Sequence, residues 1–324
     1  MDSSNFAPIL LFVYNRTHHT KTCLDSLSAC PEASASILYI YQDGLSQNSS
    51  PQKVQEWKQV QEIIKAENRF KEIHIITRSE NFGCNKNMLD GITEVVKIHG
   101  QVIVVEDDLI VSNKFLEFLN YSLKKFKNSN VGCINAFNYK MNGLPEYFFI
   151  KGANPMGWAT WKEKWAFYNY NTTELIEQLT KRADKEDWNF GRGWEIIRNH
   201  HKSMLNGGKD VVWSTSLFVN DQLCLWPSKS FVFHAGYDGS GTHTKNIGKD
   251  SLVNMSQYSV EELQDQINYS YLENIPLKID RKALLKLRHF YFKLNNLPFT
   301  TKEKVISKYY LLKHFIKTKI FRLA

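Results

Sequence analysis

Short hydrophobic runs alternate with longer segments of mixed polarity through the first 110 residues. The hydrophobic runs are rich in β-branched residues and predict strands at 9–14, 37–41, 73–77 and 102–105. The segments between them predict helices at 20–28, 51–67 and 86–99, with Thr17 as the cap of the first and with Ser49 or Ser50, followed by Pro51, at the start of the second. Hydrophobic strands that alternate with helices are typical of a parallel sheet covered on both faces. We therefore expect an α/β fold.

Polar side chains follow each predicted strand, which is where ligands of a parallel sheet bind. The first two strands end in Tyr14-Asn15-Arg16 and Gln42-Asp43-Gly44. The loop after the third contains Lys86, and the fourth strand ends in Glu106-Asp107-Asp108. Taken singly, Asp43 also fits a turn residue before glycine, and Arg16 a surface ion pair. Together, the four strand ends predict one ligand site at the rim of the sheet.

The three adjacent acids, Glu106-Asp107-Asp108, are the sharpest feature of the chain. Neighbouring carboxylates at the end of a buried strand repel one another and are hard to keep ionised without a cation. Carboxylate oxygens suit Mg²⁺ or Mn²⁺, which commonly bind one or two protein carboxylates and the phosphates of a substrate. The alternative is a solvated acidic turn before the helix expected at 113–126. We favour the metal.

These residues resemble the GT-A glycosyltransferases, most closely the inverting N-acetylglucosaminyltransferase I family and related bacterial surface-polysaccharide transferases. The resemblance covers residues 8–245. It rests on Pro8-Ile9-Leu10-Leu11 with Arg16 after it, Gln42-Asp43, Glu106-Asp107-Asp108, Pro155-Met156-Gly157-Trp158 and the string from Gly236 to His243. It implies a Rossmann-like nucleotide-binding sheet continuous with an acceptor-binding lobe, and transfer of a sugar from a UDP-sugar, possibly GlcNAc, to a saccharide.

The resemblance also implies roles for single residues. Asp108 would bind Mn²⁺ or Mg²⁺ as the cofactor, with His243 completing the metal shell or donating to phosphate. Nucleotide and donor binding falls to Tyr14, Arg16, Asp43, Lys86, Glu106 and Asp107. Acceptor binding falls to Gly157, Trp158 and Asp238. Trp158 is expected to contact sugar because an aromatic face suits the C–H face of a pyranose.

Inverting transfer needs a general base for the acceptor hydroxyl. The family places an acid beside a tryptophan, but both neighbours of Trp213 are neutral here. Asp210 is the nearest preceding acid and the predicted base. Glu195 and Asp221 remain rivals.

Composition narrows the class of protein. Hydrophobic residues make up 43% of the 324 residues, which is enough for a packed core and excludes a disordered chain. The five cysteines are scattered without a CxxC pair, which favours reduced thiols in a cytosolic protein. No hydrophobic run is long enough for a membrane span, and the start does not resemble a signal peptide.

The positive charge is concentrated at the C-terminal end. Residues 281–324 contain twelve Lys or Arg and one acid, within a chain of net charge +8. Val305, Tyr309, Leu312, Ile316, Ile320 and Leu323 follow helical spacing beside lysines. The pattern predicts a basic amphipathic helix on an anionic membrane surface; a helix packed on the body with a solvated lysine face is the alternative. We expect no nucleic-acid partner.

The expected organisation is a GT-A catalytic domain over 1–250 and a helical appendage over 251–324. Residues 1–110 would bind the nucleotide and 111–250 the acceptor. The protein would lie at the inner face of the cell membrane and act on a lipid-linked or lipopolysaccharide-type acceptor. Two other hypotheses remain open. The protein would be a sugar nucleotidyltransferase or a non-catalytic membrane-bound scaffold. The first usually has a glycine-rich phosphate loop after the first strand, and Tyr14-Asn15-Arg16-Thr17 contains no glycine.

Overall fold

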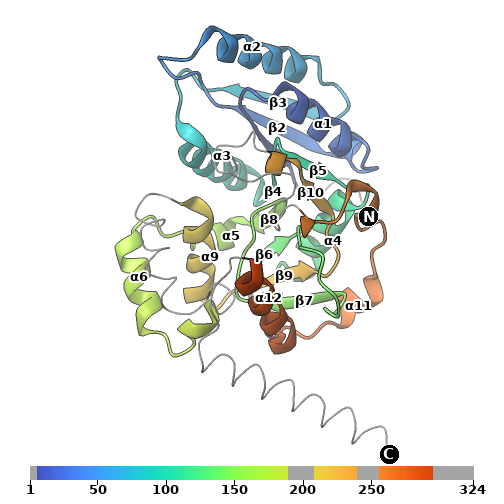
Figure 1. Cartoon of the computed structure of the whole chain (residues 1–324), viewed down its shortest axis with the longest axis vertical. Helices are drawn as coiled ribbons and strands as arrows, with labels where there is room; N and C mark the ends of the chain where they lie inside the picture. The colour runs from blue at the N-terminus through green and yellow to red at the C-terminus, as the bar shows by residue number, and fades with distance from the viewer. Residues whose placement is uncertain (1–5, 189–207, 239–254, 295–324) are drawn as a thin grey trace, which may run out of the picture.

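The computed structural model describes residues 6–188, 208–238 and 255–294 (Figure 1). An eight-stranded mixed sheet crosses the molecule in the order β3-β2-β1-β4-β8-β6-β9-β7. Its first half consists of β3 (Glu72–Thr77), β2 (Ile37–Gln42), β1 (Ile9–Val13) and β4 (Gln101–Glu106). These four strands are parallel, with Leu11 opposite both Ile40 and Val105. The expected α/β class and its Rossmann-like first half are confirmed.

Three helices connect these strands: α1 (Thr17–Ser28), α2 (Pro51–Ala66) and α3 (Gly83–His99). Helices α1 and α2 pack against each other, and α3 packs against β1 and β4. Right-handed crossovers put α3 on the opposite face, because the chain reverses direction across the sheet between β3 and β4. The start signal of α2 is confirmed, since Ser50 Oγ accepts a hydrogen bond from Lys53 N at 3.3 Å. The predicted cap of α1 is wrong: Thr17 is the first helical residue, after Arg16.

The sheet continues into the second half of the chain through a reversal of direction. Strand β8 (Trp158–Trp161) runs antiparallel to β4, and β6 (Val131–Asn135), β9 (Leu223–Pro227) and β7 (Tyr147–Ile150) follow it. A separate ribbon pairs β5 (Leu109–Val111) with β10 (Val232–His234). This ribbon brings a segment from the second half directly beside the acids that end β4.

Helices of the second half surround these strands. They are α4 (Phe115–Phe126), α5 (Lys162–Trp165), α6 (Thr172–Lys181), α9 (Lys209–Val219), α11 (Tyr269–Asn274) and α12 (Arg281–Leu294). Short 3₁₀ turns lie at η2 (Ala33–Ala35), η3 (Lys185–Asp187), η4 (Ala235–Asp238) and η5 (Val260–Glu262). One continuous core runs beneath both halves of the sheet, from Ile9 to Trp226. The two halves are therefore joined by a shared sheet and a shared core.

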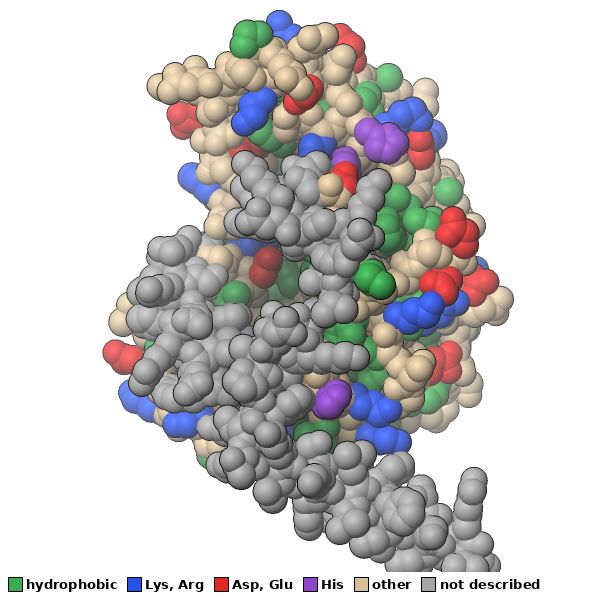
Figure 2. Space-filling model, viewed as in Figure 1, with side chains coloured by type: hydrophobic (Ala, Val, Ile, Leu, Met, Phe, Trp, Pro, Cys, Tyr) green, Lys and Arg blue, Asp and Glu red, His purple; other side chains and the backbone are tan. Residues whose placement is uncertain are grey.

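The first part of the basic C-terminal end packs on the body. Ala283, Leu284, Leu287 and Tyr291 of α12 are buried in the main core. The lysine-flanked stripe expected from Val305 onward lies outside the described residues. None of the described helices is long and apolar enough to cross a membrane. On the face in Figure 2, Lys and Arg side chains of the described part are interspersed with Asp and Glu.

Candidate functional site

The three acids lie at the carboxyl end of β4, between the two halves of the sheet. Glu106 is the last residue of β4, and Asp107 and Asp108 form the turn into β5. Two backbone hydrogen bonds hold this turn: Asp107 N donates to Phe12 O at 3.1 Å, and Ala235 N donates to Asp108 O at 2.8 Å. The acids are therefore fixed by strand β1 on one side and by the segment after β10 on the other.

Arg16 binds two of the acids at once. Its guanidinium donates to Asp107 Oδ1 and, at 2.9 Å, to Asp108 Oδ2. Burial raises the pKa of Asp107, although the charge of Arg16 opposes the change. Burial acts in the same direction on Asp108, but His234 and Arg16 together hold the pKa of Asp108 below its ordinary value. Asp108 is thus the acid of this turn that is best held as an anion.

His234 lies beside Asp108 and was not anticipated from the sequence. Because β10 pairs with β5, His234 is opposite Leu109, and its Nε2 lies 3.8 Å from Asp108 Oδ1. Its buried Nδ1 has no hydrogen-bond partner among the described residues. Burial lowers the pKa of His234, and the charge of Asp108 opposes this change.

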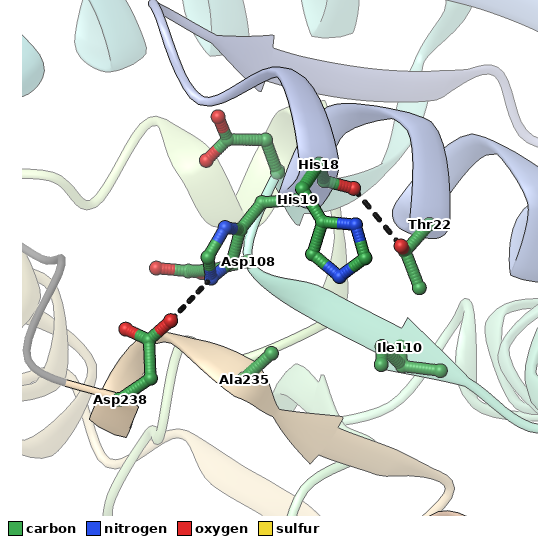
Figure 3. Close-up of a pocket in the computed structure, with 8 residues that line it drawn as sticks. His18, His19, Thr22, Asp108, Ile110, Ala235 and Asp238 are labelled. Atoms are coloured by element: carbon green, nitrogen blue, oxygen red, sulfur yellow. Dashed lines mark hydrogen bonds and ion pairs between the residues drawn. The ribbon is translucent and has the colours of Figure 1, made fainter.

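A cavity of about 100 Å³ opens beside this group, between α1, the acid turn and η4. Figure 3 shows His19 and Asp238 pointing toward each other across it, with Asp108 behind them. His19 Nε2 lies 3.3 Å from Asp238 Oδ2. Gly236 packs closely against one of these acids, since a Cβ added there would lie 2.5 Å from Asp108 Oδ2. Asp238, predicted to bind the acceptor, is therefore at the same cavity as the acids.

A second cation contacts the motif from the other half of the chain. Lys209 Nζ, at the start of α9, lies 3.5 Å from Glu106 Oε1 and 2.9 Å from Asp210 Oδ1. Burial raises the pKa of Glu106 to about 7, and the charges of Asp108 and Asp210 add to this effect while Lys209 opposes it. The predicted base, Asp210, is thus connected to the acid motif through one lysine.

Asp43 binds the loop before α3. Its carboxylate accepts hydrogen bonds from Phe82 N at 2.8 Å, Gly83 N at 2.9 Å and Asn81 Nδ2 at 3.2 Å. These contacts join the end of β2 to the loop between β3 and α3, at the rim of the sheet. Lys86, in the first turn of α3 and not in the loop, lies 4.2 Å from the centre of the Phe82 ring and pairs with Asp90. The nucleotide-binding role of Asp43 stays a prediction.

The remaining predicted residues are scattered around this centre. Tyr14 is half-buried and accepts a hydrogen bond from Gln42 Nε2 at its carbonyl. Gly157 has φ +69°, and Trp158 is only 3% exposed, with its ring tilted by 39° against the rings of both Trp165 and Trp213. Asp221 pairs instead with Lys151 and Arg182. Glu195 and His243 lie outside the described residues.

The donor set suits a divalent cation at Asp108. Arg16 occupies Oδ2, so Oδ1 is the oxygen that faces His234, whose Nε2 lies 3.8 Å away. Among the described residues, no group of three His, Cys, Asp or Glu side chains could hold a metal by itself. A carboxylate and an imidazole together fit Mn²⁺ or Mg²⁺ when phosphate oxygens of a substrate supply further ligands.

Comparison with known proteins gives only distant likenesses. No protein-family model matches the chain, and no curated protein matches it. Among solved structures, glucosyl-3-phosphoglycerate synthase from Mycobacterium tuberculosis, in complex with Mn²⁺, UDP and glucosyl-3-phosphoglycerate, aligns at 11% identity with a TM-score of 0.28. That alignment covers 42% of this chain and 44% of the synthase.

An active-site mutant of LgtC aligns at 12% identity with a TM-score of 0.35, covering 54% of this chain and 65% of LgtC. The chain thus matches less than two thirds of the length of either structure. At these TM-scores the two likenesses show neither the family nor the activity of this chain.

Proposed function

We propose that the protein is a divalent-metal-dependent glycosyltransferase of the GT-A type, which moves a sugar from a UDP-sugar to a saccharide acceptor. One observation carries the proposal: the acids that end β4 lie between Arg16 from the nucleotide-binding half and Lys209-Asp210 from the other half. This arrangement places a phosphate- and metal-binding edge beside an exposed carboxylate. Transfer from a nucleotide diphosphate needs both features in one site.

Asp108 and His234 would hold the metal, with the diphosphate of the donor as the remaining ligand. When bound, the cation offsets the charge that develops on the leaving diphosphate. Arg16 fixes the carboxylate of Asp108 and presents a second positive charge at the same edge. His243, predicted as a metal or phosphate ligand, lies in the segment that follows Asp238 along the chain.

Asp210 would act as the general base. Its side chain is 52% exposed at the first turn of α9, so an acceptor hydroxyl can reach its carboxylate. Proton removal by Asp210 makes the acceptor oxygen a nucleophile that attacks the anomeric carbon of the donor. The bond from that carbon to the diphosphate then breaks, and attack from the face opposite the leaving group inverts the configuration. Glu106, beside Lys209, would face the donor sugar.

The finer parts of the proposal concern substrate and location. The donor is UDP-GlcNAc, and the acceptor is a lipid-linked saccharide of bacterial surface polysaccharide or lipopolysaccharide synthesis. The basic residues after α12 bring the protein to the anionic inner face of the cell membrane. Flotation with anionic liposomes tests the location: loss of residues 295–324 should abolish recovery with the liposomes, and equal recovery would rule out this role.

Calorimetric titration with UDP and a panel of UDP-sugars, with and without Mn²⁺, tests the proposal. Wild type should bind UDP only with Mn²⁺, and Asp108→Ala should lose this binding. Asp25→Ala, which removes an exposed acid of α1 paired with Lys21 and Arg69, is the matched control and should bind like wild type. No binding by wild type under any condition would remove the basis for a uridine-nucleotide donor. Metal-dependent binding without UDP release would instead favour the scaffold.

A further inference from the structure

Lys209 has an unusual position for a lysine at the start of a helix. Its side chain is only 10% exposed, although it occupies the first position of α9. The ammonium group lies within 3.5 Å of Glu106 Oε1 and 2.9 Å of Asp210 Oδ1. Buried lysines are rare unless they are paired, and this one is paired twice.

The two partners of Lys209 come from distant parts of the chain. Glu106 ends the central strand β4 of the nucleotide-binding half, whereas Asp210 lies on α9, which precedes β9 of the other half. The start of α9 follows Gly208, and no side chain caps it. The lysine is therefore a polar link between the acid motif and the helix that carries the proposed base.

A phosphate-binding role fits Lys209 poorly. Its charge is already shared by two carboxylates, and little of its side chain is exposed to a ligand. Arg16 holds the other side of the motif, where the cavity beside Asp108 opens. Burial alone would lower the pKa of Lys209, but Asp210 and Glu106 raise it above its ordinary value, so the ammonium persists at neutral pH.

We propose that Lys209 is a positioning residue: it holds the Asp210 carboxylate at a fixed distance from the acid motif, and so from the donor sugar. This role rests on the proposed function. Its importance follows from the geometry of group transfer, in which a displacement of about 1 Å can lower the rate about 100-fold. Lys209 does not touch the reacting atoms and acts through Asp210.

The chain offers a matched control in Lys151. This lysine is 11% exposed and is also held between two acids, Asp184 Oδ2 at 2.8 Å and Asp221 Oδ1 at 2.5 Å. Lys151→Met removes the same kind of doubly paired ammonium from a different network. Lys151→Met therefore shows how much activity is lost when two ion pairs are removed away from the site. Any larger loss in Lys209→Met comes from the broken link to Asp210.

The experiment compares Lys209→Met, Lys209→Arg and Lys151→Met in the full chain. Two quantities are measured: UDP release from a panel of UDP-glucose, UDP-galactose, UDP-GlcNAc and UDP-GalNAc with a saccharide acceptor mixture, and the Kd for UDP with Mn²⁺. Lys209→Met should lower kcat about 100-fold, with the Kd for UDP within about threefold. Lys209→Arg should restore most of the rate, because it keeps the charge. Lys151→Met should keep kcat within about twofold of wild type.

Other outcomes separate this inference from the proposed function. Wild-type turnover with an unchanged kcat in Lys209→Met overturns the positioning role alone. An equal loss of UDP affinity also overturns it, since Lys209 would then bind the nucleotide. Lack of UDP binding or of any turnover by wild type overturns the proposed function and the positioning role together. If Lys209→Met does not fold, Lys209→Gln, which keeps a hydrogen-bond donor between the acids, replaces it with the same expectations.

Discussion

Two cations hold the acids that end β4, and they reach them from different halves of the molecule. Arg16 follows β1, the strand next to β4, and binds Asp107 and Asp108. Lys209 begins α9, about a hundred residues after the acids in the chain, and binds Glu106 together with Asp210. On the Arg16 side of the site, the cation binds only acids of the Glu106-Asp107-Asp108 motif. On the Lys209 side, the cation joins this motif to Asp210 of α9.

Under the proposed function, the difference separates two tasks within one site. The Arg16 side is built from neighbouring parallel strands, whose backbones are fixed by the sheet, and it opens toward the cavity beside Asp108. Such a rigid edge is suited to bind a phosphate and a cation. The Lys209 side depends on a side-chain link between the strand and a helix of the second half. It can therefore set the distance over which a group is transferred without contributing to nucleotide binding.

Arg16→Ala should have the largest effect and acts on the first side. The substitution leaves Asp107 and Asp108 without their cation, and loss of one partner of a buried ion pair costs about 3–5 kcal/mol of stability. UDP binding in Mn²⁺ should also be lost, because the Asp108 carboxylate is no longer held. Urea unfolding and calorimetry measure the two effects.

The control for this substitution is Arg281→Ala. Arg281 is 56% exposed and pairs with Asp187 at the surface, where an ion pair contributes about 0–1 kcal/mol. A loss of stability in Arg16→Ala no greater than in Arg281→Ala would show that the acids of the turn do not need their cation.

Gly236→Ala should have a smaller effect, confined to the Arg16 side. A Cβ at this position would lie 2.5 Å from Asp108 Oδ2 and 2.9 Å from His234 Cε1, so the carboxylate and the imidazole must move apart. We expect the affinity for UDP in Mn²⁺ to fall at least about 10-fold, which corresponds to about 1.4 kcal/mol. UDP binding is measured by calorimetry on the folded variant.

Gly132→Ala is the matched glycine control. Its Cβ would lie 2.5 Å from Leu217 Cδ2 in the core, so it should lower stability by about 1–3 kcal/mol and leave UDP affinity unchanged. Equal UDP affinities in the two alanine variants would count against the proposed role of Asp108 and His234 in holding the metal.

The sequence predicted the Arg16 side of the site better than the Lys209 side, for a physical reason. Each strand and helix of the first half carries a local signal, such as the hydrophobic run at β4 or the Ser50-Pro51 start of α2. Parallel neighbouring strands end at the same edge, so Arg16 could be expected near the acids before any contact was known. The position of Arg16 and the order of these elements follow from short-range patterns.

The pairing of distant segments leaves no such local pattern. His234 reaches Asp108 only because β10 pairs with β5, and Lys209 reaches Glu106 only because α9 begins beside β4. A histidine ending a hydrophobic strand and a lysine starting a helix both look ordinary in sequence. The packing of α12 could not be predicted from the sequence for the same reason. Its buried face is defined by contacts with Tyr139 and with the core, which are distant in the chain.

Asp184→Asn should have the smallest effect and sets the scale for an ion-pair network outside the site. Asp184 pairs with Arg182 and Lys151, and its hydrogen bond with Arg182 in particular lowers the pKa of Asp184 to about 2, against the effect of burial. A lowered pKa in the folded state means that the carboxylate stabilises the fold above the pKa of the unfolded chain, about 3.9, and that this contribution is lost as pH falls toward 2.

The variant should therefore be about 1–2 kcal/mol less stable than wild type at pH 7. The difference should begin to shrink below about pH 4, where this carboxylate becomes protonated in the unfolded chain, and should be lost as pH falls toward 2. Urea unfolding at pH 7 and pH 3 measures it, and UDP affinity in Mn²⁺ at pH 7 should match wild type. If the difference in stability between Asp184→Asn and wild type stayed constant with pH, the effect would come from packing. The ion pairs around Lys151 would then be a poor electrostatic reference for those of Lys209.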